Sequence, residues 1–152
     1  MPAIDCRAAD PQEYGSAAAL RQEMSVELGD DFDARSPDWR EKFAVYFRNK
    51  HAEGTADVFL AIEDERVIGC AVVSILDDYR RFVFDMKTAW VNAVFVHPAY
   101  RRRGIARRLM QMTIEWARAR HCRRVRLRAS DEGRELYASL GFGAGREMEL
   151  NL

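Results

Sequence analysis

The sequence predicts one α+β domain of the three-layer α/β kind, in which a mixed sheet lies between helices on both faces. Three observations predict it. The chain has 152 residues, of which 48% are apolar, and that is enough for one complete hydrophobic core. Segments with helical spacing of apolar residues precede, and later alternate with, segments rich in β-branched residues. No repeat, low-complexity tract or flexible linker divides the chain, so residues 1–152 are expected to form a single domain.

The N-terminal half is expected to contain a strand, two helices and a hairpin. Asp10, Pro11 and Glu13 supply an N-cap, a first-turn proline and a capping-box carboxylate for the first helix. The polar turn at residues 64–66 joins two apolar, β-branched runs into the hairpin. The expected elements are a strand at residues 3–7, helices at 10–28 and 36–53, and strands at 58–63 and 67–76.

The C-terminal half is expected to alternate strands with helices. Ile105, Leu109 and Trp116 fall on one face of a long helix. Each strand-helix-strand unit requires its two strands to be parallel neighbours. The expected elements are a loop at residues 77–88, a strand at 89–96, a helix at 104–120, a strand at 124–129, a short helix at 132–140 and a last strand at 148–152.

Charge and composition argue against several classes of protein. Lys plus Arg and Asp plus Glu both number 24, so no net charge holds the molecule on nucleic acid or an anionic membrane. The chain has neither a signal-like start nor an apolar run of about 18 to 20 residues, so we expect a cytoplasmic protein with no membrane partner. Its three cysteines lack metal-ligand spacing, and no metal site is expected.

The most informative segment joins the strand at 89–96 to the long helix. The first N–H groups of a helix lack internal partners and carry partial positive charge, which suits a phosphate. Gly104 and the small Ala106 let a diphosphate approach the backbone, and nearby arginines add charged donors. The alternative is a solvated basic surface at a helix start. Neither an NTPase phosphate loop nor a dinucleotide fingerprint is present. Five arginines fall within eight positions: Arg101, Arg102, Arg103, Arg107 and Arg108.

This segment resembles the acetyl-CoA-binding motif of the GNAT acetyltransferase superfamily. In that motif Arg or Gln, two residues, Gly, one residue, and Gly or Ala bind the pyrophosphate, and Arg101, Gly104 and Ala106 stand at those positions. The resemblance implies a GNAT-type, mostly antiparallel central sheet and acetyl-CoA as the acyl donor.

The resemblance also implies which groups hold the donor. In the family, the strand before the loop bulges and offers main-chain groups to the pantetheine arm, and these map onto Phe95 and Val96, with Val94 alongside. The diphosphate is expected to bind main-chain N–H groups in the following run: Arg102, Arg103, Gly104, Ile105, Ala106 and Arg107.

A second segment, residues 131–142, resembles a later motif of the family, in which a helix carrying a tyrosine ends in Gly-Phe. By this resemblance Tyr137 donates a proton to the CoA thiolate, since a hydroxyl donor stabilises charge that develops on the departing sulfur. The alternative is a tyrosine that only packs on the core. Ser130 stands where many members carry Asn, and is expected either to contact the cofactor or to cap the short helix.

The acceptor amine must be neutral to attack, so it needs a base or a proton route to water. In some relatives a carboxylate on the central strands acts as that base, but residues 90–96 and 125–129 of this sequence carry none. The first two helices form the acceptor wall in the family, and we expect Glu27 and Asp30 to attract a cationic amine, or else to be merely solvated. Asn92 is expected to hold a water or the substrate, or to be structural.

The leading hypothesis is direct transfer of an acetyl group to a primary amine of a small molecule or peptide within a ternary complex. One alternative is a non-catalytic acyl-CoA-binding sensor or interaction module that keeps the fold. Another is nucleic-acid binding through the clustered arginines, which overall neutrality disfavours. Homodimers are common in the family, and no segment of this sequence establishes one.

Overall fold

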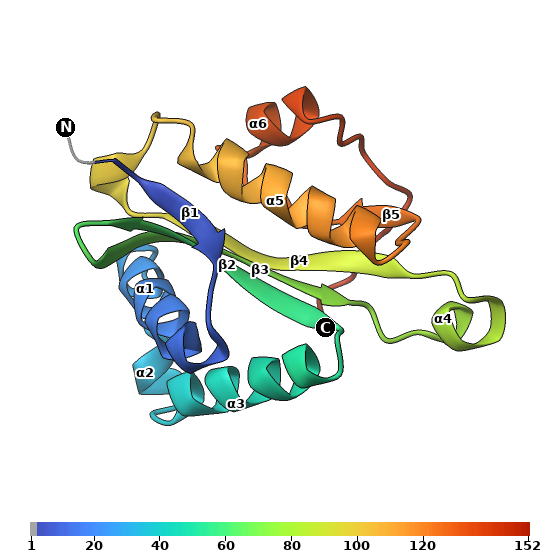
Figure 1. The fold of residues 1–152 in the computed structure, drawn as a ribbon, viewed down its shortest axis with the longest axis horizontal. Coiled ribbons are helices and arrows are strands. Elements are labelled where there is room, and N and C mark those ends of the chain that lie inside the picture. Colours follow the sequence, from blue (N-terminus) through green and yellow to red (C-terminus); the bar gives the residue numbers. More distant parts are fainter. Residues whose placement is uncertain (1–2) are drawn as a thin grey trace.

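The structure, a computed structural model, describes residues 3–152, and its five strands form one sheet in the order β1-β2-β3-β4-β5 (Figure 1). The first three pairs of neighbours are antiparallel and β4 pairs with β5 in parallel, which confirms a mixed, mostly antiparallel sheet. In chain order the elements are β1 (Asp5–Ala8), a 3-10 turn (Pro11–Glu13), α1 (Tyr14–Glu27), α2 (Phe32–Arg35), α3 (Trp39–Ala52), β2 (Ala56–Glu63), β3 (Arg66–Ile75), α4 (Tyr79–Phe84), β4 (Thr88–Val96), a second 3-10 turn (Pro98–Tyr100), α5 (Ile105–Ala119), β5 (Arg124–Arg126) and α6 (Arg134–Ser139).

Helices cover both faces of the sheet, as predicted. Figure 1 shows α1, α2 and α3 on one side and α5 and α6 on the other. Tyr14 and Phe47 belong to the apolar cluster on the first side, whereas Leu109 and Trp116 belong to the cluster under α5. Among residues 3–152, no helix has the length and apolar character needed to cross a bilayer.

The start of α5 packs closely against the sheet because β3 carries a glycine there. A Cβ atom on Gly69 would lie 3.2 Å from the carbonyl oxygen of Phe95 and 3.3 Å from the side chain of Ile105. Ile105, the first residue of α5, is buried. Gly69 therefore gives the helix start room to sit beside the end of β4.

A bulge divides β4 into two halves. The first half has β3 on one side and β5 on the other, whereas the second half pairs with β3 alone. Val72 lies opposite Ala93 and Val73 opposite Val91, so Asn92 has no counterpart on β3. The parallel pairing of β4 with β5 spans only Thr88 to Trp90. Beyond the bulge, β4 runs toward α5 with no described strand paired to its outer edge.

Some predicted boundaries differ from the structure. The segment at 77–88, predicted as a loop, contains α4, which Asp78 caps by accepting hydrogen bonds from the N–H groups of Arg80 and Arg81 at 3.0 and 3.2 Å. The short α2 was not predicted, and the strand predicted at 124–129 ends at Arg126. The capping box at the first helix is confirmed, although a 3-10 turn precedes α1.

The prediction of a strand at 148–152 is wrong. This segment pairs with no strand, and Met148, Leu150 and Leu152 are exposed by 98%, 81% and 115%. Two ion pairs link the C-terminal segment to the β5 region: Arg126 to Glu147 at 3.0 Å and Arg128 to Glu149 at 3.6 Å. Because β5 ends early, side-chain contacts replace the backbone ladder, and the second predicted parallel crossover does not form.

Candidate active site

Gly104 sets the geometry of the basic loop. It stands immediately before α5 with φ +77° and ψ 10°, a left-handed conformation that glycine adopts without strain. A Cβ atom there would meet no atom within 4 Å, so the backbone conformation and not space calls for glycine. No side chain caps the start of α5. The first N–H groups of the helix are therefore available to an anionic ligand.

Two of the loop arginines turn back onto the protein. The Nε of Arg101 donates to the carbonyl oxygen of Val96 at 3.0 Å, and its guanidinium lies 3.9 Å from the carboxylate of Glu27. Arg107 donates to the hydroxyl of Ser139 at 2.6 Å, which ties the first turn of α5 to the end of α6. These two side chains brace the loop.

The arginines between them remain exposed. Arg102 has φ +62°, a left-handed conformation that is uncommon for a residue with a side chain. Arg103 stacks on the ring of Tyr100 at 5.3 Å. Their charges thus stand at the mouth of the loop, and the main chain from Arg102 to Arg107 forms the predicted run at the helix start.

The three β4 residues expected to hold the pantetheine arm lie beyond the bulge. Val94 and Val96 pack with the cluster under α5, and Phe95 packs with the cluster on the α1 side. The bulge that the resemblance implied is present, and it falls at Asn92. Beyond it, the outward main-chain groups of β4 are not engaged by β5.

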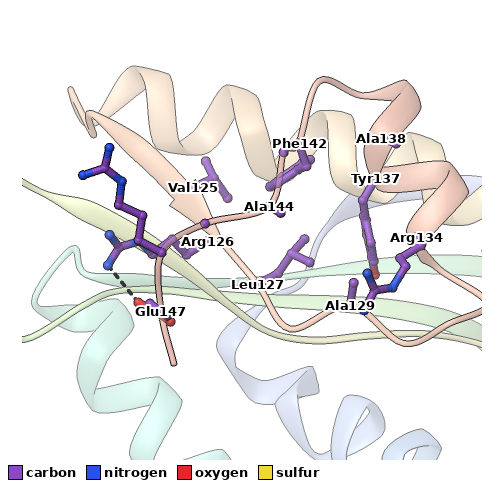
Figure 2. Close-up of a pocket in the computed structure, with 13 residues that line it drawn as sticks. Val125, Arg126, Leu127, Ala129, Arg134, Tyr137, Ala138, Phe142, Ala144 and Glu147 are labelled. Carbon is purple, nitrogen blue, oxygen red and sulfur yellow. Dashed lines mark ion pairs between the residues drawn. The ribbon is translucent and has the colours of Figure 1, made fainter. Parts of the chain in front are cut away.

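Tyr137 extends from α6 toward the segment around Ala129 (Figure 2). Its ring contacts Phe142 edge to face, with centroids 5.9 Å apart. Burial raises the pKa of Tyr137 above its usual value, and a tyrosine is protonated at neutral pH even without this rise. The position suits a hydrogen-bond or proton donor.

Two further features surround this tyrosine. Gly133 lies under the ring, and the sequence analysis did not single it out, although its place four residues before a helical tyrosine was a usable signal. Ser130 accepts a hydrogen bond from the N–H of Gly133 at 3.2 Å. The hydroxyl of Ser130 therefore caps the turn before α6, which is one of the two roles expected for it.

A cavity of about 510 Å³ lies between the β5 region, α6 and the C-terminal segment (Figure 2). Val125, Leu127 and Ala129 line one side of it, and Tyr137 and Phe142 line another. The residues of the basic loop are not part of this wall. Tyr137 thus stands at the border of an open space on the α6 side of the molecule.

The residues expected on the acceptor side lie in two places. Glu27 is at the end of α1 beside Arg101, and Asp30, just beyond it, forms an ion pair with Arg35 at 2.7 Å. Asn92 is in the β4 bulge, where its amide donates to the hydroxyl of Ser74 at 3.0 Å and to the carbonyl of Trp90 at 3.2 Å. Its side chain is exposed and already held in place.

Comparison with known proteins supports the resemblance to the GNAT acetyltransferases. The profile of the Acetyltransferase (GNAT) family matches residues 21–142. An aminoglycoside N(6')-acetyltransferase type 1 from Salmonella typhimurium is 30% identical over 87 residues, which cover 55% of this chain and 60% of that protein. The chain thus spans about 60% of the length of the curated relative that it matches.

Solved structures share the fold over nearly the whole chain. A predicted acetyltransferase with acetyl-CoA from Clostridium acetobutylicum superposes with a TM-score of 0.80 and 24% identity, covering 98% of this chain and 96% of that one. A GCN5-related N-acetyltransferase from Ralstonia eutropha superposes with a TM-score of 0.78 and 20% identity, covering 99% of each chain. With the family profile matching most of its length, and with this fold, the chain belongs to the acetyltransferase (GNAT) family.

Proposed function

We propose that the protein transfers an acetyl group from acetyl-CoA to a primary amine of a small molecule or peptide, by direct attack within a ternary complex. The observation that carries the proposal is the path of β4. The strand stays paired with β3 but loses β5 after Trp90, so that its outer edge is free up to the loop that leads into the uncapped start of α5 at Gly104. Such a path offers main-chain groups to an extended arm and then N–H groups to a diphosphate.

These residues fit acetyl-CoA in shape and charge. The free edge of β4 at Val94, Phe95 and Val96 is proposed to hold the pantetheine arm, and Ser130 is proposed as a further contact. The exposed Arg102 and Arg103 add positive charge where the diphosphate binds. The solved relative from Clostridium acetobutylicum contains acetyl-CoA, which supports this choice of donor.

When bound, acetyl-CoA supplies an activated thioester. The amine nitrogen bonds to the thioester carbonyl carbon as the carbon–sulfur bond breaks, and a proton must reach the departing sulfur. Tyr137 is proposed to donate it, because a tyrosine hydroxyl is protonated at neutral pH and this position matches the tyrosine of the family motif. The amine loses its own proton to solvent or to a base outside β4 and β5, which carry no carboxylate.

For the acceptor, Glu27, Asp30 and Asn92 are proposed to line the approach. Glu27 and Asp30 place carboxylates where an ammonium group would be attracted, although neighbouring arginines offset part of their charge. The similarity to an aminoglycoside acetyltransferase supports a small-molecule amine.

The test of this proposal is Tyr137→Phe, which removes only the hydroxyl. Turnover, measured as thiol release from acetyl-CoA with a panel of amines, is expected to fall by about 10²- to 10⁴-fold, the usual contribution of a positioned acid. The Kd for CoA, measured by calorimetry, is expected to stay within about twofold, because the ring remains.

Unchanged turnover in the Phe variant would remove Tyr137 from the mechanism. Tight binding of acetyl-CoA by the wild-type protein without thiol release from any amine would favour the non-catalytic sensor instead. Steep salt dependence of RNA or DNA binding at physiological salt would favour the nucleic-acid alternative.

A further inference from the structure

Arg21 of α1 occupies an unusual place for an arginine. Its guanidinium carbon lies 4.6 Å from the ring centroid of Phe95 on β4 and 5.0 Å from that of Phe32 on α2. The side chain is half-buried between these two elements, and burial lowers its pKa from the ordinary value. Contact with ring faces covers the flat sides of a guanidinium and leaves its N–H edge free for hydrogen bonds.

Within residues 3–152, that N–H edge has neither a hydrogen-bond acceptor nor an ion-pair partner. Two carboxylates in the segment that follows α1 are held by other arginines. Asp30 pairs with Arg35 at 2.7 Å and Asp33 with Arg40 at 2.8 Å. Asp30 lies close enough to Arg21 to favour its charged form, but does not bond to it. Arg21 is only half-buried and has no bonded anion among the described residues, so its N–H edge can donate to an anionic group that comes from outside the chain.

The location indicates where that partner comes from. Phe95 belongs to the half of β4 that is proposed to hold the pantetheine arm, and its ring faces the α1 side of the sheet. The opposite face is covered by α5. An anion that reaches Arg21 therefore approaches from the α1 side of the sheet, the side covered by the first three helices. The acceptor is the molecule expected on that side.

We propose that Arg21 binds a carboxylate on the acceptor, so that the acceptor is an amino-acid-like molecule carrying both an amine and a carboxylate. This inference rests on the proposed function and names its substrate class. The planar fork of arginine matches a carboxylate with two parallel hydrogen bonds. The acidic side chains of Glu27 and Asp30, on the same wall, complement the ammonium of such a zwitterion before it loses its proton.

The experiment compares acceptors with and without the carboxylate, and because the amides also have a less basic amine, the readout is the change in the acid-to-amide ratio between variants. Amino acids and their carboxamides are assayed by thiol release from acetyl-CoA with wild-type protein, Arg21→Gln and Arg21→Lys. The wild type is expected to prefer the acid by about 10- to 100-fold in kcat/KM, the range for a charge-assisted hydrogen-bond pair. The Gln variant is expected to lose this preference, and the Lys variant to keep part of it because it keeps the charge without the fork.

The ratio of acid to amide is measured within each variant, so a general loss of folded protein cancels. Arg40→Gln is the matched control, since Arg40 is an arginine of the neighbouring α3 whose carboxylate partner is already on the protein. It is expected to keep the wild-type ratio. A wild type that does not distinguish acid from amide, or an Arg21→Gln variant that still does, overturns the carboxylate site.

A second readout does not depend on turnover. N-acetyl amino acids carry the carboxylate without an ammonium group, and calorimetry is expected to show their binding to wild-type protein and at least tenfold weaker binding to Arg21→Gln. If this Arg21-dependent binding is present while no amine releases thiol, the proposed acetyl transfer fails and the carboxylate site stands. If thiol release occurs but neither readout depends on Arg21, the transfer stands and the carboxylate site fails.

Discussion

At the scale of single residues, the position of the Tyr137 ring depends on the lack of a side chain at Gly133. A Cβ atom on Gly133 would lie 2.7 Å from Cε2 of the Tyr137 ring, closer than such atoms can approach. Gly133 itself has φ −84° and ψ −17°, an ordinary helical conformation open to any residue. The glycine is therefore needed for the ring and not for the backbone. Replacing it moves the tyrosine while leaving the chain path acceptable.

Gly133→Ala is expected to lower kcat by about tenfold or more, because a displacement of about 1 Å at a reacting group is costly. Stability is expected to stay level or to fall slightly, because Gly133 is the N-cap residue of α6, a position that favours glycine over alanine. The measurements are kcat, the KM for acetyl-CoA and the thermal midpoint of unfolding.

The matched control is Gly15→Ala in α1, where a Cβ atom would meet nothing within 4 Å. It adds the same methyl group to a helix without touching Tyr137, so its kcat is expected to equal that of the wild type. In a Tyr137→Phe background, Gly133→Ala is expected to cause little further loss of kcat. An equal loss in both backgrounds would show that Gly133 does not act through the hydroxyl.

At the scale of elements, the start of α5 needs a left-handed backbone conformation at the place where the diphosphate is proposed to bind. Gly104 precedes α5 with φ +77°, and Gly54 follows α3 with φ +76°, both with open space at the Cβ position. Alanine at either site costs about 1 kcal/mol or more, since left-handed backbone disfavours a side chain. The two glycines therefore differ in location and not in local conformation.

Gly104→Ala is expected to weaken CoA binding by about tenfold, because relief of the strain moves the N–H groups at the helix start and the added methyl crowds the diphosphate. Gly54→Ala is expected to lose similar stability and to keep the wild-type Kd. Calorimetric titration with CoA and thermal unfolding measure the two effects. Equal Kd values for the two variants would contradict the assignment of the loop.

At the scale of the whole molecule, an ion pair links the edge strand β1 to the 3-10 turn that precedes α1. Arg7 of β1 binds both carboxylate oxygens of Glu13, with its two nitrogens at 2.7 and 2.8 Å. The Glu13 carboxylate also accepts from the N–H of Asp10 at 2.8 Å. These bonds, the one from Arg7 first, lower the pKa of Glu13 from 4.5 to about 2.

Because the folded pKa lies below the unfolded one, the contribution of Glu13 to stability is complete above about pH 4.5 and is lost as the pH falls toward 2. Glu13→Gln is therefore expected to be less stable than the wild type at pH 7, by a small amount because water reaches the pair. Urea unfolding at a series of pH values is expected to show the difference shrinking as the pH falls from 5 to 2. A difference that stays constant with pH would contradict the role of the charge.

The sequence by itself determined the parts of this protein whose cause is local. Helical spacing of apolar residues, capping boxes and β-branched runs depend on near neighbours, and they predicted α1, α3, α5 and the hairpin of β2 and β3. The anion-binding character of the loop from Arg101 to Ala106 could be predicted for the same reason, since a glycine and arginines at a helix start create positive potential from neighbouring residues alone.

Only the tertiary structure decided the features that depend on distant segments meeting. The bulge at Asn92 follows from the register of β4 against β3, which sequence pattern alone does not set. The place of Arg21 between Phe32 and Phe95 needs three elements to come together. The alternating apolar residues at 148–152 predicted a strand, yet no partner strand reaches them, because β-pairing requires a neighbour that only the assembled fold supplies.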